Sequence, residues 1–119
     1  MKKLQIKVGV DMARTSRLEQ LAQNRAFLER VFHLSELYDT RPEHLAGIFA
    51  AKEAFFKALG LIPRWLQVEV VKQPSGKPSL KTGAELRLDG LSTFDLSITH
   101  EGDYAIAVVV MLFEMEQEP

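Results

Sequence analysis

The sequence predicts a single α+β domain over residues 1–119, with an N-terminal strand, two main helices and a mostly antiparallel sheet. Three observations lead to this prediction. Apolar residues alternate at the start of the chain, recur with helical spacing from about residue 15 to residue 60, and alternate again from residue 66 onward. The 119 residues, of which 46% are hydrophobic, suffice for one buried core and are too few for a second full domain.

The first predicted strand has apolar residues in alternation with polar residues or glycine. Its apolar positions are Leu4, Ile6, Val8 and Val10. A period of two is typical of a strand with one buried face, so we expect these four side chains to face the core. Asp11 follows at once and is expected to end the strand on the face away from the core.

Two helices are predicted after this strand. The first runs from about Thr15 to Phe32, because its apolar residues fall on one helical stripe and its start carries hydroxyl side chains that cap helices. The second has clearer boundaries, since it begins at Pro42, keeps its apolar spacing to Leu59 and is followed by Gly60.

The second half of the chain is predicted to form strands. A strand begins near Leu66, residues 73–78 have the composition of a turn, and residues 80–88 form a weaker strand candidate. Residues 94–99 alternate, and residues 104–113 form a continuous apolar run after the turn at Gly102. We expect these last two segments to pair as a hairpin.

Composition and charge exclude several functional classes. The chain has no cysteine, which excludes disulfides, thiolate metal sites and thiol nucleophiles and fits a reducing compartment such as the cytoplasm. No apolar run is long enough to span a membrane, and a net charge of −1 argues against nucleic-acid binding. Residues 1–30 carry seven basic and three acidic side chains, so we expect an acidic partner to bind at this end.

Two carboxylates are candidates for a metal site. Asp11 lies at the predicted strand end, and Glu53 lies on a helix face whose other members are small or charged. This pair favours Mg²⁺ over Zn²⁺, because hard cations prefer oxygen ligands and complete their shell with water and substrate phosphate. The alternatives left open are a capping or turn role for Asp11 and a surface ion pair between Glu53 and Lys57.

Further polar residues are candidates for contact with a phosphate. Lys52 lies at the edge of the apolar stripe of the second helix, where we expect its ammonium to face a phosphate. His100 ends a predicted strand and has two open roles, contact with a phosphate or capping of the turn. The segment Gly76-Lys77-Pro78 is interpreted as a turn and not a P-loop, because proline stands where a P-loop has serine or threonine.

Several segments occur together in an order found in one enzyme family. They are Val8-Gly-Val-Asp11, residues 27–32, residues 45–60, Gly76-Lys-Pro78 and residues 96–100, followed by residues 104–109. The most specific part is Ala-Ala-Lys-Glu-Ala-Phe-Phe-Lys-Ala-Leu-Gly, residues 50–60. With these segments the chain resembles, over nearly its whole length, the holo-acyl-carrier-protein synthase family of phosphopantetheinyl transferases. The resemblance implies a phosphopantetheinyl-transferase-like α+β fold.

This resemblance implies a reaction and its site residues. The phosphopantetheine arm of coenzyme A would pass to a serine hydroxyl of an acyl carrier protein, with adenosine 3′,5′-bisphosphate leaving. Asp11 and Glu53 match the metal ligands for Mg²⁺, Lys57 would stabilise negative charge, and Glu53 is the candidate general base, directly or through water. The residues implied in coenzyme binding are Lys52, Lys57, Gly76, Lys77, Pro78 and His100.

The resemblance also implies partners. It predicts a homotrimer with active sites between subunits and an acyl carrier protein docked on the basic first helix. Arg17 matches a basic docking position, and Arg14 and Arg25 extend the patch. Carrier proteins are acidic, so the surplus of basic residues at this end agrees with that expectation. Neither a nucleic acid nor a membrane is expected as a partner.

Three positions depart from the family pattern. Ile48 stands where these enzymes usually have an arginine that binds a phosphate of the coenzyme, and residues 61–65 replace a small, glycine-rich segment. Arg14 lies where many relatives have an acidic residue. Arg64 is a candidate to replace the missing arginine in coenzyme binding. The alternative function that these departures leave open is a relative that binds the carrier protein with weakened or lost transferase activity.

Overall fold

The structure, a computed structural model, describes residues 1–117 and confirms the predicted α+β fold. The elements in chain order are β1 (Lys2–Arg14), α1 (Thr15–Leu21), α2 (Arg25–Val31), η1 (Leu34–Tyr38), α3 (Pro42–Leu59), η2 (Trp65–Gln67), β2 (Val68–Lys72), β3 (Pro78–Thr82), β4 (Leu91–Glu101) and β5 (Tyr104–Glu116). Here η marks a 3₁₀ helix. No helix within residues 1–117 is long and apolar enough to cross a membrane.

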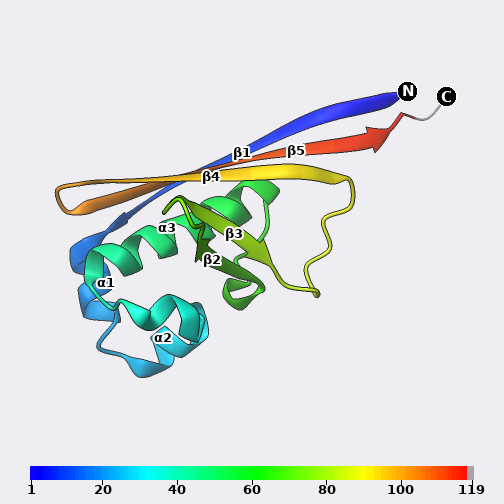
Figure 1. Cartoon of the computed structure of the whole chain (residues 1–119). Helices are drawn as coiled ribbons and strands as arrows, with labels where there is room; N and C mark the ends of the chain where they lie inside the picture. The colour runs from blue at the N-terminus through cyan, green and yellow to red at the C-terminus, as the bar shows by residue number, and fades with distance from the viewer. Residues whose placement is uncertain (118–119) are drawn as a thin grey trace.

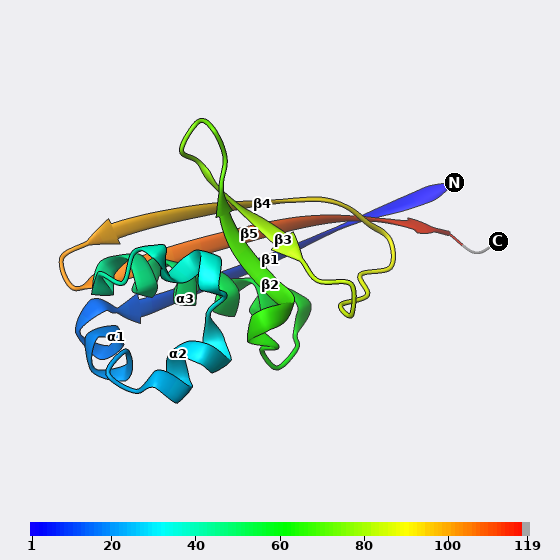
Figure 2. The same ribbon diagram turned by 60° about the horizontal axis from the view of Figure 1, so that its bottom comes forward.

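A three-stranded antiparallel sheet forms one layer, and the helices cover one of its faces (Figure 1). The strand order is β1-β5-β4, and β1 pairs with β5 along its whole length, from Lys2 opposite Glu116 to Arg14 opposite Tyr104. The β4–β5 hairpin confirms the prediction, and Gly102 in its turn has a positive φ of 58°. The second sheet, β2–β3, forms a separate two-stranded ribbon beside α3 (Figure 2).

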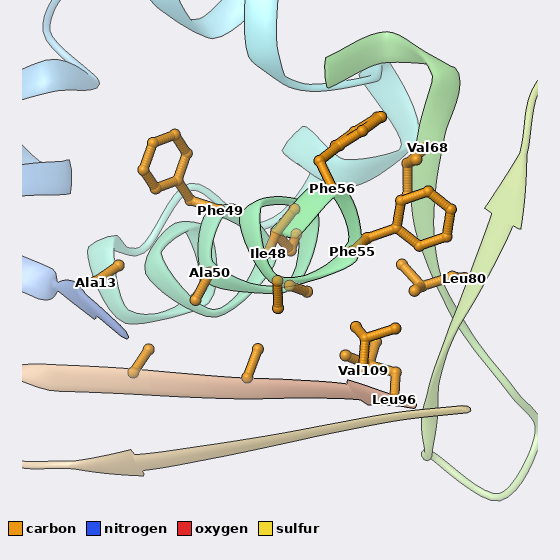
Figure 3. Close-up of a cluster of buried hydrophobic side chains, with 14 of the residues drawn as sticks. Ala13, Ile48, Phe49, Ala50, Phe55, Phe56, Val68, Leu80, Leu96 and Val109 are labelled. Carbon is orange, nitrogen blue, oxygen red and sulfur yellow. The ribbon is translucent and has the colours of Figure 1, made fainter. Parts of the chain in front are cut away.

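Helix α3 lies at the centre of the core. Its start and end follow the predicted signals, with Pro42 in the first turn and Gly60 in the left-handed conformation after the last. Phe55 and Phe56 are fully buried. Side chains from both sheets surround α3 in Figure 3. The labelled ones from the strands are Ala13, Val68, Leu80, Leu96 and Val109.

Strand β1 crosses α3 at unusually short range. A β carbon built at Gly9 would lie 1.9 Å from the carbonyl oxygen of Ala54 and 2.7 Å from the amide nitrogen of Ala58. Only glycine fits between these backbones without displacing one of them. The crossing therefore sets the position of the β1 residues that follow Gly9.

The prediction for the faces of β1 was wrong. Gly9, Asp11 and Ala13 lie on the side that packs against α3, and the strand continues past Asp11 to Arg14. The alternating apolar side chains instead lie on the opposite face, where Leu4, Ile6, Val8, Val10 and Met12 are 52–67% exposed. The close approach of α3 admits only small residues on its side, so the larger apolar side chains face outward.

The predicted helix from Thr15 to Phe32 is divided into α1 and α2. Asn24 causes the break, since its backbone is extended and its side chain accepts a hydrogen bond from the amide of Phe27. The turn lets both short helices bury residues, Leu18 from α1 and Phe27 from α2. The weaker strand predicted over residues 80–88 is also shorter, because β3 ends at Thr82.

Candidate active site

Two carboxylates from different elements meet beside the β1–α3 crossing. Asp11 follows Gly9 by two residues on β1, and Glu53 precedes Ala54 on α3. Partial burial raises the pKa of Glu53 from its usual value to about 7, and the neighbouring Asp11 carboxyl adds to that increase. The positive charges of Arg17 and Lys57 act in the opposite direction. Two acidic groups so close are costly to ionise together.

Lys57 completes this group of charged side chains. It lies one helical turn beyond Glu53, and its Nζ atom is 3.1 Å from the carbonyl oxygen of Val10 and 3.4 Å from Oδ1 of Asp11. The structure therefore brings Asp11 together with Glu53 and Lys57, two predicted site residues that follow it by more than forty positions in the sequence. The Lys57 side chain remains largely exposed and reaches the cluster from the solvent side.

The two carboxylates fit a hard divalent cation. Their oxygen atoms are the ligands that Mg²⁺ prefers, and a cation would relieve the repulsion between the two carboxylates, which adds to the effect of burial on the pKa of Glu53. Within residues 1–117, no three His, Cys, Asp or Glu side chains are grouped closely enough to hold a metal ion. Asp11 and Glu53 would then supply a partial shell, which water and substrate oxygens complete.

A cavity of about 320 Å³ opens at the other end of α3, near the end of β4. Its walls come from η1, α3, the β2–β3 ribbon and β4. Three residues expected in coenzyme binding line it: Gly76, Pro78 and His100. Ile48 also lines it and is only 4% exposed, so the wall that lacks the usual arginine is apolar.

His100 is held at the wall of this cavity by a backbone contact. Its Nε2 atom lies 3.0 Å from the carbonyl oxygen of Glu43, which accepts a hydrogen bond when Nε2 carries a proton. A β carbon at Gly47 would lie 3.1 Å from the same Nε2 atom, so glycine leaves the ring the space it occupies. This contact fixes the orientation of the His100 ring through Nε2 and does not involve Nδ1.

Gly76 and Pro78 line this cavity, but Lys77 between them does not. Its ammonium donates to Oδ1 of Asp95 at 2.6 Å and to the carbonyl oxygen of Leu96 at 2.9 Å. These contacts join the β2–β3 turn to β4 and place Lys77 at a second, smaller hollow of about 260 Å³. Lys77 therefore anchors the turn that presents Gly76 and Pro78 to the larger cavity.

Lys52 lies elsewhere than expected. Its side chain is fully buried, and burial lowers the pKa of its ammonium despite the opposing effect of Glu36. The ammonium donates to Glu36 and to two backbone carbonyl oxygens, which uses all three of its protons. The expectation that Lys52 faces a phosphate is therefore corrected, since this side chain lies inside the protein and its donors are occupied.

Arg64 is also not at the cavity. Its guanidinium forms an exposed ion pair with Glu85 at 3.6 Å, and it is not among the residues that line the cavity around Ile48. No part of the cavity wall comes from Arg64, and its replacement of the missing arginine stays a prediction.

The three basic residues predicted to dock a partner lie at the end of β1 and on the two short helices. The guanidinium of Arg14 lies over the ring of Tyr104, at 5.7 Å from its centroid. Arg25 forms an exposed ion pair with Glu29 at 3.0 Å. Arg17 is exposed on α1 and close enough to Glu53 to lower the pKa of that carboxyl. This basic surface thus borders the carboxylate pair.

Sequence reasoning missed Glu36 and the cavity wall around Tyr38. Glu36 is 1% exposed although it lies in a short 3₁₀ helix without apolar periodicity. One signal was present, because Lys52 lies among the apolar residues of α3 and a lysine in that position requires a buried acceptor. The identity of the acceptor depends on the tertiary fold.

Comparison with known proteins gives matches to one family. Residues 7–109 match the family described as the 4′-phosphopantetheinyl transferase superfamily. A holo-[acyl-carrier-protein] synthase from Frankia casuarinae is 41% identical over 111 residues, which cover 87% of this chain and 93% of the relative. The same enzyme from Geobacillus kaustophilus is 41% identical over 116 residues, with 87% of this chain and 86% of the relative covered.

Solved structures of this family share the fold. A holo-[acyl-carrier-protein] synthase from Helicobacter pylori, in complex with coenzyme A, is 31% identical, has a TM-score of 0.77, and is matched over 87% of this chain and 98% of its own. One from Bacillus anthracis, in complex with CoA (3′,5′-ADP), is 29% identical with a TM-score of 0.77, over 93% of this chain and 99% of its own. Since the family match and the relatives cover most of the chain, this protein belongs to the holo-[acyl-carrier-protein] synthases of the 4′-phosphopantetheinyl transferase superfamily.

Proposed function

We propose that this protein transfers the phosphopantetheine arm of coenzyme A to a serine hydroxyl of an acyl carrier protein, in a reaction that depends on Mg²⁺. The observation that carries the proposal is the meeting of Asp11 on β1 with Glu53 and Lys57 on α3, the helix that also forms a wall of the cavity near Ile48. The names of the relatives and the coenzyme bound in two of the similar structures support the same activity.

The chemistry is a phosphoryl transfer. The serine oxygen of the carrier protein forms a bond to the phosphorus that bears the pantetheine arm, and the bond from that phosphorus to the bridging oxygen breaks. Adenosine 3′,5′-bisphosphate leaves with the electron pair, and the serine proton passes to a base. Because the nucleophile belongs to the partner, this chain supplies positioning, charge stabilisation and a proton acceptor.

Asp11 and Glu53 would hold the Mg²⁺ ion. When bound, Mg²⁺ neutralises the negative charge of the diphosphate and of the leaving group. Lys57 adds a positive charge on the solvent side of the same cluster, where an incoming phosphate would approach. Glu53 is also the candidate proton acceptor, directly or through a water molecule, because its carboxyl lies in the same cluster, beside Asp11 and Lys57.

The cavity near His100 is the proposed coenzyme site. Its volume of about 320 Å³ lies at the lower end of the range of small-molecule sites, and its wall combines apolar side chains with the imidazole of His100. The turn at Gly76 and Pro78 forms one border of the cavity. Along α3, Ile48 and Glu53 are five residues apart, a rise of about 7–8 Å, so one extended ligand spans both regions.

We propose a homotrimer as the active assembly. The outer face of β1 exposes five apolar side chains in one row, and a row of this kind is typical of a surface that another protein chain covers. The paired ends of β1 and β5 also extend beyond the helical layer (Figure 1). A trimer with active sites between subunits would cover this row and bring a second chain close to Asp11.

The acidic carrier protein is proposed to dock on the basic surface of Arg14, Arg17 and Arg25. This surface borders Glu53, as the effect of Arg17 on the pKa of that carboxyl indicates, so a serine presented there would approach the proton acceptor. Opposite charges on the two partners also accelerate association. The cytoplasm is the proposed location, in accordance with the absence of cysteine.

One assay tests the proposed function. The protein is incubated with coenzyme A, Mg²⁺ and an apo acyl carrier protein, and the carrier is weighed by mass spectrometry. We expect the mass to increase by one phosphopantetheine group, with loss of the product when a chelator is added or when Glu53→Gln replaces the parent. Capture of the carrier without any change in mass would instead indicate a binding protein that lacks the transferase activity. Full turnover in the presence of the chelator would reject the role of Mg²⁺.

A further inference from the structure

Glu36 and Lys52 form an ion pair in the interior of the protein. Their charged atoms, Oε1 of Glu36 and Nζ of Lys52, are 2.7 Å apart, and both side chains are fully buried. Among the residues that the structure describes, they are the two charged residues that are almost completely buried. Burial of two charges carries a large desolvation penalty, so a pair of this kind needs nearly complete hydrogen bonding.

The hydrogen bonds of this pair join five segments. The ammonium of Lys52, on α3, donates to the carbonyl oxygen of Val31 at 2.7 Å, to Glu36 at 2.7 Å and to the carbonyl oxygen of Trp65 at 3.1 Å. The carboxylate of Glu36, on η1, accepts from the amide of His33 at 2.7 Å and from the amide of Val70 at 2.8 Å. Residues of α2, η1, α3, η2 and β2 are thus tied to one point.

Three of these segments, η1, β2 and α3, form walls of the cavity proposed for the coenzyme. From η1 come Ser35 and Tyr38, on either side of Glu36 in the sequence, and from β2 come residues 69–72, which include Val70. The hydroxyl of Ser35 also donates to Glu69, which adds a second polar link between these walls. The facing wall is α3, at Gly47 and Ile48. The ion pair therefore joins the walls formed by η1, β2 and α3, although neither of its members lines the cavity.

We propose that Glu36 and Lys52 are positioning residues for coenzyme binding, which set the separation of η1 and β2 from α3 and so the width of the cavity. This inference rests on the proposed function. Cohesion of the core alone does not require the pair, because an apolar pair of similar volume stabilises an interior as well or better. What an apolar pair does not supply is a polar bond from α3, through Glu36, to the Val70 amide of β2.

The test compares coenzyme A affinity with folding stability. The parent, Glu36→Gln, Lys52→Met and the double variant Glu36→Leu/Lys52→Met are measured by calorimetry with coenzyme A, by thermal melting and by steady-state kinetics. The double variant leaves no unpaired buried charge, so it is expected to fold even if a single variant does not. Met111→Ala is the control, because Met111 is fully buried on β5 and lines neither cavity.

For the double variant we expect coenzyme A to bind at least about tenfold more weakly, with a matching increase in KM for coenzyme A and less than about threefold change in kcat or in KM for the carrier protein. Amide exchange at residues 68–72 should accelerate in the same variant. The control should lose stability and keep the coenzyme A affinity of the parent.

Two results would overturn the inference. If the folded double variant bound coenzyme A as tightly as the parent, the pair would have a purely structural role, and the transferase function would stand. If the control lost coenzyme A affinity in proportion to its loss of stability, the weaker binding of the double variant would be explained by general destabilisation of the fold. Failure of the parent itself to bind coenzyme A would reject the proposed function and, with it, the positioning role.

Discussion

Gly9 on β1 lies directly against Ala54 on α3, so closely that a β carbon at position 9 would be 1.9 Å from the Ala54 carbonyl oxygen. Asp11 is two residues beyond Gly9 on the same strand face, and Glu53 is the neighbour of Ala54. The absence of a side chain at one position thus sets the distance between two carboxylates.

The first prediction concerns Gly9→Ala. The added methyl group forces β1 and α3 apart, so we expect a loss of unfolding free energy on the order of 3 kcal/mol, together with loss of transferase activity. Chemical denaturation and the mass-spectrometric assay measure the two effects. Gly102→Ala is the matched control, since open space surrounds this turn glycine and only its positive φ adds a cost of about 1 kcal/mol. Parent-like stability of Gly9→Ala would contradict the close crossing.

The second prediction is the pH dependence that follows from Glu53. The folded protein holds the proton of Glu53 up to a pKa of about 7, whereas the unfolded chain releases it near the usual value of 4.5. Between these values the unfolded state binds fewer protons, so stability falls as the pH rises. The contribution is complete below pH 4.5 and is lost as the pH passes 7.

This effect is measured as the difference in unfolding free energy between the parent and Glu53→Gln from pH 4.5 to pH 8. We expect the parent to lose about 1–2 kcal/mol relative to the variant, less than the full pKa shift would give because the carboxyl is partly solvated. Asp11→Asn should reduce the loss, since it removes the neighbouring carboxylate. Parallel pH profiles for the parent and Glu53→Gln would contradict the raised pKa.

The third prediction separates two residues that the resemblance links to coenzyme binding. His100→Ala should weaken coenzyme A binding at least about fivefold, because the ring lines the cavity in a fixed orientation. Arg64→Ala should change the affinity by less than about twofold, since its side chain forms an exposed pair with Glu85. Titration calorimetry with coenzyme A distinguishes the two. Equal loss in both variants would return Arg64 to the coenzyme site.

The fourth prediction concerns the basic docking surface. Arg17 influences the pKa of Glu53, so its replacement would change both the docking of the carrier protein and the protonation of Glu53. We therefore expect the clearer result from Arg14→Glu with Arg25→Glu: KM for the carrier protein increases at least about fivefold, and KM for coenzyme A changes less than about twofold. Added salt should weaken the parent in the same way. Lys81→Glu, an exposed reversal on β3, serves as the control, and an equal effect there would show that only net charge matters.

The fifth prediction is a change of assembly. Ile6→Glu with Val8→Glu places two charges in the exposed apolar row of β1, so the proposed trimer should dissociate to monomers in analytical ultracentrifugation, with loss of activity. Leu34→Glu is the control, because Leu34 is 90% exposed on η1, away from that row. A parent that sediments as a monomer would reject the trimer.

Local patterns in the sequence predicted the elements whose limits are set locally. Helix α3 has proline at its start and glycine after its end, and the β4–β5 hairpin has alternation followed by a glycine turn. The two faces of β1 could not be assigned in this way. Alternation shows that one face is more apolar than the other, but it does not show which face α3 covers. The break at Asn24 likewise depends on where Leu18 and Phe27 are buried.

The same distinction applies to the site. Glu53 and Lys57 share one helix face, so their spacing predicted their proximity, and the position of Asp11 at a predicted strand end made it the candidate partner of Glu53. Lys52 was placed wrongly because its partners come from distant segments, and the pattern around a lysine does not reveal its acceptor. Contacts between residues far apart in the sequence cannot be predicted from the local pattern around either residue.

The outer edge of β1 has a consequence for the newly made chain. Because the sheet order is β1-β5-β4, β1 is an edge strand within the described residues, and it carries both unpaired backbone groups and a row of apolar side chains. Such an edge is a template for non-native strand addition. Lys2, Lys3 and Lys7 on the same strand act as gatekeepers, since like charges repel when identical edges approach in register. Loss of these lysines would expose the unassembled chain to edge-to-edge aggregation before it finds its correct partners.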